Sequence, residues 1–93
     1  MSSTADLWWV YMLECRGGRL YTGATNDVRA RFLKHLRGKG AMFTRLNPPL
    51  RLAAAMPVGT KAQALRLEYS LKQECRAEKL AWAFRWSWQD VDP

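Results

Sequence analysis

Glu68 is the residue whose surroundings in this sequence most favour a catalytic or metal-binding function. On a helix over residues 61–73, it falls between two apolar arcs, one made of Ala64, Leu67 and Leu71 and the other of Ala62, Leu65 and Tyr69. A carboxylate in such surroundings is costly unless a cation compensates its charge. Lys72, one helical turn later, could be that cation. A divalent metal ion is the alternative, because Mg²⁺ keeps most of its water shell and needs few protein ligands.

Two tyrosines, Tyr11 and Tyr21, belong to segments that we expect to pair as strands, where they could be cross-strand neighbours. Half-buried tyrosines commonly serve packing, with their hydroxyls hydrogen-bonded. Alternatively, a phenol can take a proton from water, and a nearby metal ion or arginine helps by lowering its pKa. The spacing of these residues leaves both interpretations open.

Arg31 and His35 lie four residues apart, on the same side of a predicted helix. The planar guanidinium of Arg31 suits the charge that builds up on a phosphate group in its transition state, although an ordinary surface arginine is the alternative. His35 is the only histidine, and a lone histidine beside an apolar stripe serves structure more often than catalysis. Taken singly, neither residue defines a site.

The apolar pattern predicts the elements that must position these side chains. Residues 8–14 are apolar on both alternating faces, which predicts a strand covered on both sides. A turn at residues 15–18 leads to a second strand over residues 19–24, so the two form a hairpin. Asn26 or Asp27 can cap a helix that runs to about Arg37, with a buried stripe of Val28, Phe32 and Leu36, and with Arg31 and His35 at its edge.

The second half of the chain contains one more predicted strand and two helices. Residues 41–47 are expected to form a basic loop, and residues 50–56, bracketed by Pro49 and Pro57, a third strand. Thr60 and Gln63 have capping-box spacing ahead of a helix over 61–73. A further helix begins near Arg76 and carries through Leu80, and the aromatic tail is expected to pack on the domain, above all Trp82, Trp86 and Trp88.

These elements predict one α+β (α/β) domain over residues 1–93, with a core at about 8–82 and a tail at 83–93. Its small three-stranded antiparallel sheet is flanked by helices, in the order β-β-α-β-α-α. The two cysteines are too few for a disulfide scaffold, and we expect reduced, partly buried thiols. No apolar run approaches the ~20 residues needed to cross a bilayer, and no signal peptide is evident. We therefore expect a soluble, cytoplasmic protein, either a monomer or a weak dimer.

The charge distribution indicates a nucleic-acid partner. The formal net charge is +7, and nine basic residues between Arg16 and Arg51 face only one acidic residue, Asp27. A positive surface of this kind is typical of proteins that bind the phosphate backbone, although a merely soluble basic surface is the alternative. The residues expected to contact nucleic acid are Arg29, Lys34, Arg37, Lys39, Thr44 and Arg45.

Taken together and in order, these residues resemble the GIY-YIG nuclease family over about residues 8–82. Val10-Tyr11-Met12 stands where that family has Gly-Ile-Tyr, and Tyr21-Thr22-Gly23 stands for Tyr-Ile-Gly, with Gly23 as its structural glycine. Arg31 matches the helix arginine, His35 follows one turn on, and Glu68 falls on the later helix where the family keeps its metal-binding glutamate. Residues 38–45 and 71–80 look like the small single-domain bacterial branch.

The resemblance implies hydrolysis of phosphodiester bonds in DNA, with a part in DNA repair or recombination. It places a single Mg²⁺ or Mn²⁺ on Glu68, assigns proton abstraction from water to Tyr11, and lets Arg31 stabilise the pentavalent phosphate. Tyr21 and His35 would position water or phosphate. The sequence departs from the family at Val10, in place of glycine, and in having no asparagine after Asn47.

Two other functions are consistent with the sequence. A non-catalytic DNA- or RNA-binding module with a degenerate site has the same positive surface. An adaptor protein is a third class, and it requires the tryptophans of the tail to be exposed as a patch. Since no sequence-reading helix is evident, we expect contacts with phosphate and nucleic-acid shape to dominate, which implies strong salt dependence.

Overall fold

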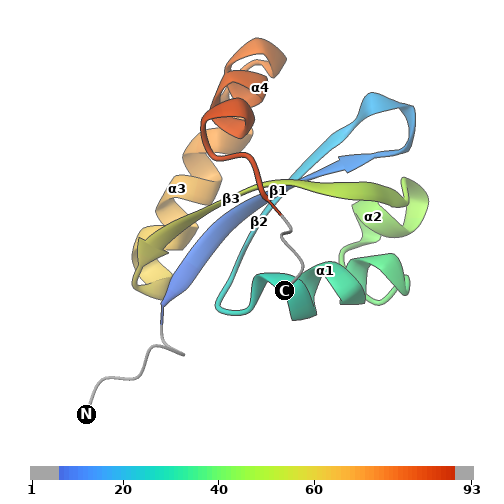
Figure 1. Cartoon of the computed structure of the whole chain (residues 1–93), viewed down its shortest axis with the longest axis horizontal. Coiled ribbons are helices and arrows are strands. Elements are labelled where there is room, and N and C mark those ends of the chain that lie inside the picture. Colours follow the sequence, from blue (N-terminus) through green and yellow to red (C-terminus); the bar gives the residue numbers. More distant parts are fainter. Residues whose placement is uncertain (1–6, 90–93) are drawn as a thin grey trace.

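A three-stranded antiparallel sheet forms the centre of the molecule, with the strand order β2-β1-β3 (Figure 1). The computed structural model describes residues 7–89. The strands are β1 (Trp8–Cys15), β2 (Leu20–Thr25) and β3 (Pro49–Gly59). Helices α1 (Val28–Leu36) and α2 (Met42–Leu46) lie on one side of the sheet, and α3 (Lys61–Gln73) and α4 (Arg76–Arg85) lie on the other (Figure 1). The predicted sheet between helices is therefore confirmed.

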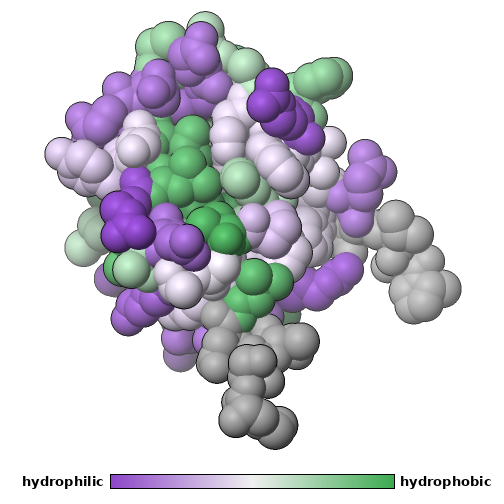
Figure 2. Space-filling view, turned by 90° about the vertical axis from the view of Figure 1, so that its left-hand side faces the viewer, coloured by the Kyte–Doolittle hydropathy of each residue, from purple (hydrophilic) through white to green (hydrophobic). Residues whose placement is uncertain are grey.

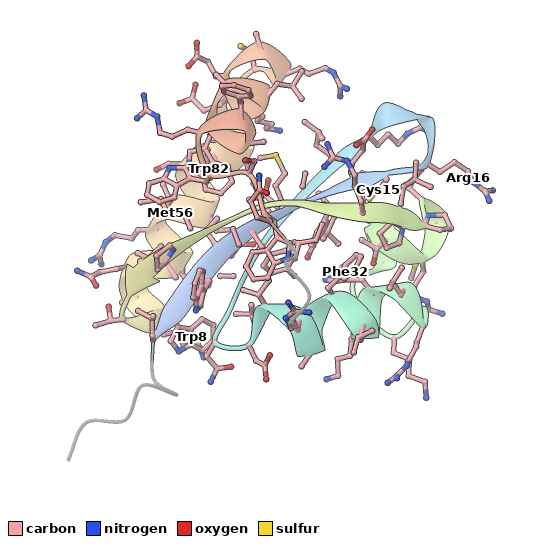
Figure 3. All side chains as sticks on the ribbon, viewed as in Figure 1. Trp8, Cys15, Arg16, Phe32, Met56 and Trp82 are labelled. Atoms are coloured by element: carbon pink, nitrogen blue, oxygen red, sulfur yellow. The ribbon has the colours of Figure 1, made fainter. Side chains whose placement is uncertain are left out.

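The central strand β1 is covered on both faces, as its apolar pattern predicts. Tyr11 and Leu13 belong to a buried cluster that includes Val28 of α1. Val10 packs instead with residues of α3, and Met12 packs with a residue of α4. All three clusters place side chains between a helix and the sheet. Figure 3 shows Phe32 of α1 and Trp82 of α4 projecting toward the sheet from opposite sides. Burial of this apolar surface is the main stabilising contribution to the fold.

The hairpin between β1 and β2 brings the two motif tyrosines near each other. Tyr11 pairs with Gly23 and Leu13 pairs with Tyr21, so the tyrosines are diagonal neighbours on one face of the sheet. A short helical turn over Arg16–Gly18 connects the strands, and Gly17 and Gly18 have φ angles of 77° and 75°. Residues other than glycine rarely adopt this conformation, which explains the glycine pair. Arg16 points away from the molecule at this tip (Figure 3).

The two long helices next to the hairpin begin where their capping residues predict. The Asp27 side chain accepts a hydrogen bond from the Ala30 amide at 3.1 Å, and Thr60 and Gln63 form the complete capping box of α3. The buried stripe of α1 is shorter than expected, because Leu36 is 48% exposed. On α3 only one of the two apolar arcs is buried. The other faces solvent, with Leu65 and Tyr69 exposed.

Three predicted segments differ from the structure. Residues 41–47 were expected to form a loop, but Met42–Leu46 form the short helix α2, so the element order is β-β-α-α-β-α-α. Strand β3 continues past Pro57 to Gly59. This is possible because β3 is an edge strand, where a residue without an amide proton is tolerated. Helix α4 continues past Leu80 to Arg85, because its apolar residues face the sheet.

The end of the described chain runs along the outer edge of β3. The Ala55 amide donates to the Trp86 carbonyl at 3.1 Å, and the Trp88 amide donates to the Ala53 carbonyl at 3.0 Å. Small alanine side chains at 53–55 leave room for this approach and for Ala83 of α4. Trp82, Trp86 and Trp88 all pack against buried clusters. The exposed tryptophan patch required by the adaptor hypothesis is therefore not formed.

The surface of the described chain also carries apolar residues. On the face drawn in Figure 2, apolar residues lie in the middle and hydrophilic residues lie around them.

Both cysteines are free: Cys15 is buried, as expected, whereas Cys75 is exposed. Within residues 7–89, no helix has the length and apolarity required to cross a membrane.

Candidate active site

A chain of buried hydrogen bonds connects β1 to α1 and α2 at the centre of the candidate site. The Tyr11 hydroxyl lies 2.8 Å from Nε2 of His35. Nδ1 of the same imidazole lies 2.7 Å from Oγ1 of Thr44. The Thr44 hydroxyl in turn donates to the Ala41 carbonyl at 2.9 Å. All three side chains are almost completely buried, with exposed fractions of 1% each.

The direction of each hydrogen bond in this chain follows from the bond that Thr44 donates to the Ala41 carbonyl. A threonine hydroxyl has one proton, and Thr44 gives it to the Ala41 carbonyl, so Oγ1 must accept from His35. Nδ1 of His35 therefore carries the imidazole proton, and Nε2 is left as an acceptor. Tyr11 consequently donates its phenolic proton to Nε2. The Tyr11 oxygen keeps its lone pairs as acceptors, and Arg31 is the neighbour that donates to one of them.

Burial keeps both members of this pair uncharged. Desolvation lowers the pKa of His35 to about 4, and the positive charge of Arg31 one turn earlier adds to the effect. Desolvation also raises the pKa of Tyr11 above its ordinary value, although the neighbouring Arg31 guanidinium acts in the opposite direction. Arg31 thus acts on the pKa of Tyr11 in the expected direction, but burial outweighs it and the pKa stays above that of an ordinary phenol. At neutral pH the pair consists of a phenol and a neutral imidazole.

Two glycines make room for these rings. A Cβ atom at Gly23 would lie 2.4 Å from the Tyr11 hydroxyl oxygen, because the phenol crosses directly over its strand partner. A Cβ atom at Gly40 would lie 2.3 Å from Nδ1 of His35. Real side chains do not come so close, so any other residue at these positions would displace a ring. The close approach of the Tyr11 ring therefore explains why the motif has glycine at position 23.

The aromatic and charged residues around Tyr11 meet at the free edge of β2. The Tyr21 ring lies 6.3 Å from the Tyr11 ring and 5.0 Å from the His35 ring, measured between centroids. From the other side of the sheet, Nζ of Lys72 lies 5.7 Å from the centre of the Tyr21 ring. The same ammonium group is 2.8 Å from Oε2 of Glu68. Helices from both faces of the sheet therefore contribute to one location.

All of the predicted catalytic residues converge there. Arg31, Tyr21 and Glu68 each act electrostatically on the Tyr11 hydroxyl, and Arg31 is its hydrogen-bonding neighbour. Arg31 also lines a hollow of about 440 Å³ at the Ala24 end of β2, together with Trp8 and Lys34. A phosphate group placed at the β2 edge would meet a guanidinium, a carboxylate and a phenol.

The carboxylate of Glu68 is suited to one hydrated metal ion, not to a full protein cage. Its side chain is 17% exposed, so water molecules and a substrate can reach it. Across the described part of the chain, no three histidine, cysteine, aspartate or glutamate side chains gather closely enough to enclose a metal. Mg²⁺ accepts one carboxylate together with water and phosphate oxygens. Lys72 now compensates the charge, as the alternative interpretation of Glu68 predicts.

The residues expected to bind nucleic acid differ in their accessibility. Arg29, Lys34, Arg37, Lys39 and Arg45 are all exposed. Thr44 is the exception, because its side chain is buried and both of its hydrogen bonds are internal. Its hydroxyl cannot reach a nucleic acid, and we correct its expected function to that of holding His35.

Several residues of the site carry no recognisable signal in the sequence. Phe43 of α2 contacts the Tyr21 ring with centroids 5.8 Å apart, but its segment was interpreted as a loop. Gly40 is not among the site residues expected from the sequence, although it makes space for His35. The departure at Val10 affects the site little, because that side chain faces Ala64 and Leu71 on the opposite side of the sheet from Tyr11.

Comparison with known proteins shows the family of this chain. The model of the GIY-YIG catalytic domain matches residues 7–81. A UPF0213 protein of Xanthomonas campestris pv. campestris is 53% identical over 75 residues, which are 81% of this chain and 74% of that relative. A UPF0213 protein of Staphylococcus epidermidis is 43% identical over 75 residues, 81% of this chain and 92% of the relative.

A solved structure shares the fold. The solution NMR structure of the UPF0213 protein BH0048 from Bacillus halodurans has a TM-score of 0.51 and 44% sequence identity, and the match covers 81% of this chain and 80% of that one. The family match spans most of the residues described above, including every predicted catalytic residue. This chain therefore belongs to the GIY-YIG family and to its group of small bacterial UPF0213 proteins.

Proposed function

We propose that this protein is a metal-dependent endonuclease that hydrolyses phosphodiester bonds of DNA and acts in DNA repair or recombination. The observation that carries the proposal is the convergence of Tyr11, Arg31 and Glu68 at the free edge of β2. These groups come from three different elements and serve no common packing purpose. Hydrolysis of a phosphodiester needs a base for water, a cation for the transition state and a ligand for a metal, and this edge supplies all three.

The hydrogen-bond chain supports a specific path for the proton in this proposal. A water molecule attacks phosphorus, and its proton passes to the Tyr11 oxygen while the phenolic proton moves to Nε2 of His35. Tyr11 ends the step neutral and His35 becomes an imidazolium ion. Because burial and Arg31 lower the pKa of His35 to about 4, this proton is soon lost to solvent. Thr44 holds the imidazole in the tautomer that can accept it.

The charged residues act on the phosphate. Arg31 stabilises the negative charge that builds up on the pentacovalent phosphorus with its planar set of donors. Glu68 is the residue that would hold Mg²⁺ or Mn²⁺, and such an ion supplies charge stabilisation and orientation of the phosphate. A metal ion held by Glu68 would take the place of Lys72 at the carboxylate, and the Lys72 ammonium group would then be available to the substrate. The departing oxygen takes a proton from solvent.

A non-catalytic DNA- or RNA-binding module is the second candidate function. The ion pair between Glu68 and Lys72 favours it, since the carboxylate already has a counter-charge at 2.8 Å. The positive surface serves either function. The two differ only in turnover, so a cleavage assay separates them.

The experiment combines labelled single-stranded, duplex and branched DNA, and RNA, with Mg²⁺, Mn²⁺ or EDTA. Wild-type protein is compared with Arg31→Ala and Glu68→Gln. The matched control is Arg66→Ala, which removes the same charge as Arg31→Ala from an exposed position on α3. We expect metal-dependent cutting that both site variants lose and the control retains. Tight binding without cutting would instead establish the binding module, and equal cutting in EDTA would refute the metal's participation.

A further inference from the structure

A second hollow lies at the hairpin end of β2, beside the candidate active site. It has a volume of about 320 Å³, and its walls are formed by Arg19, Leu20, Phe43, Arg76 and Lys79. Phe43 connects the two places, because its ring contacts Tyr21 and also lines the hollow. Its side chain is 38% exposed, so part of an aromatic surface faces open space.

The charged side chains around this hollow are all positive. Three cations, Arg19, Arg76 and Lys79, line it without any carboxylate. None of them forms an ion pair within the part of the chain that the structure describes. Elsewhere the same helices balance their charges, as in the hollow where Arg85 meets Glu74 and Glu78. Cations that converge without a counter-charge repel one another, and an anion placed among them relieves that repulsion.

The carboxylate of Glu14, in an adjoining hollow, does not neutralise these three cations. Arg76 also lines an adjoining hollow that contains Glu14. Glu14, however, is already paired with Arg51, whose Nε lies 2.7 Å from its Oε1. The positive charge beside Phe43 therefore remains available to an external anion.

The hollow and the candidate active site lie along the same strand, β2, so a substrate strand that follows this edge passes both. Leu20 lines this hollow and Ala24 lines the one that contains Arg31, and both belong to β2. Four residues of a strand span about 13 Å. A chain of phosphates that follows the β2 edge through the candidate active site therefore reaches both hollows. At a rise of about 3.4 Å per nucleotide, the distance corresponds to about four nucleotides of a duplex strand.

We propose that the hollow binds a flanking nucleotide of the substrate strand, with its phosphate among Arg76, Lys79 and Arg19 and its sugar or base against Phe43. The proposal rests on the nuclease function, because it names a second point at which the same strand is held. Guanidinium and ammonium groups are the usual phosphate ligands, and an aromatic ring provides a platform for a base. These residues lie outside the set predicted from the sequence to contact nucleic acid.

The test measures the affinity for a labelled oligonucleotide in EDTA, at several salt concentrations, for Arg76→Ala/Lys79→Ala. The matched control is Arg66→Ala/Arg85→Ala, which removes the same two charges from α3 and α4 outside the hollow. Two lost phosphate contacts should lower the salt-dependence slope by about 1.4 to 1.8. We expect affinity to fall about tenfold or more at low salt in the test variant. The control should lose no more than about twofold.

Substrate length makes the test directional. Oligonucleotides are shortened one nucleotide at a time from either side of the cleavage point. On one side only, removal of the nucleotide that occupies the hollow should abolish the difference between wild type and Arg76→Ala/Lys79→Ala. The single variant Arg76→Lys keeps the positive charge and should retain most of the wild-type affinity.

The possible results distinguish this proposal from the function on which it rests. If the control variant loses as much affinity as the test variant, or if shortening never removes the difference, the hollow is not a subsite and the proposal is wrong. If the wild-type protein neither binds nor cuts any nucleic acid, the nuclease proposal itself fails. Circular dichroism of each variant verifies that the fold is retained.

Discussion

Acidification should destabilise this fold through His35, and the size of the effect can be calculated from its burial. The imidazole has a pKa of about 4 in the folded protein and about 6.5 in an unfolded chain. Between these values the unfolded chain binds a proton that the folded protein does not bind. The free energy of unfolding therefore falls as pH falls through this window. The loss is about 2 kcal/mol between pH 7 and pH 5, and approaches about 3 kcal/mol below pH 4.

Urea unfolding at pH 7, 6 and 5, followed by tryptophan fluorescence, measures this effect. The control is His35→Gln, because an amide can donate to Thr44 and accept from Tyr11 but does not titrate. Carboxylates contribute equally to both proteins, so the difference between them isolates the histidine. Since His35 is the only histidine, no other imidazole contributes. If wild type and His35→Gln lose the same free energy between pH 7 and pH 5, burial does not lower the pKa of His35 and the reasoning from its burial is refuted.

Three substitutions test other parts of the site. Thr44→Val removes the buried acceptor and should cost about 1–3 kcal/mol, a fall in Tm of roughly 4–24 °C by scanning calorimetry. Thr44→Ser keeps the hydroxyl and should cost much less. Gly23→Ala places a Cβ atom against the Tyr11 hydroxyl and should lower the free energy of unfolding by about 1–3 kcal/mol, measured by urea unfolding. Stability equal to that of the wild type would show that the phenol has room to move. Lys72→Met frees Glu68 and should tighten Mn²⁺ binding about two- to fivefold by electron paramagnetic resonance, and weaker binding would contradict the competition.

The sequence predicts well those elements whose local signals agree with their packing. The continuous apolar run of β1, the Asp27 cap and the Thr60 capping box each specify an element without reference to the rest of the chain. Helix α2 has no such signal, since it contains only Met42–Leu46 and begins without a side-chain cap. It is held by its packing, with Phe43 against Tyr21.

The site shows the same division between local and long-range information. The resemblance to the family motifs indicates Tyr11, Arg31 and Glu68, because each motif is local. The hydrogen-bond chain is different, because Thr44 and His35 meet only when α2 folds back beside α1. The pKa of Tyr11 is also a long-range property. Burial by residues from several elements outweighs the one arginine that the sequence places near it.

The free edge of β2 explains how so short a chain can combine these groups. An exposed edge strand presents unpaired backbone groups and is a hazard for aggregation. Here the edge is flanked by Arg19 and Arg31 and, from the opposite face, by Lys72. Positive charges discourage pairing with another strand, and the same charges attract a polyanion. An additional strand at this edge would protect the sheet but would cover the site, so leaving β2 open serves substrate access while its cations limit the risk.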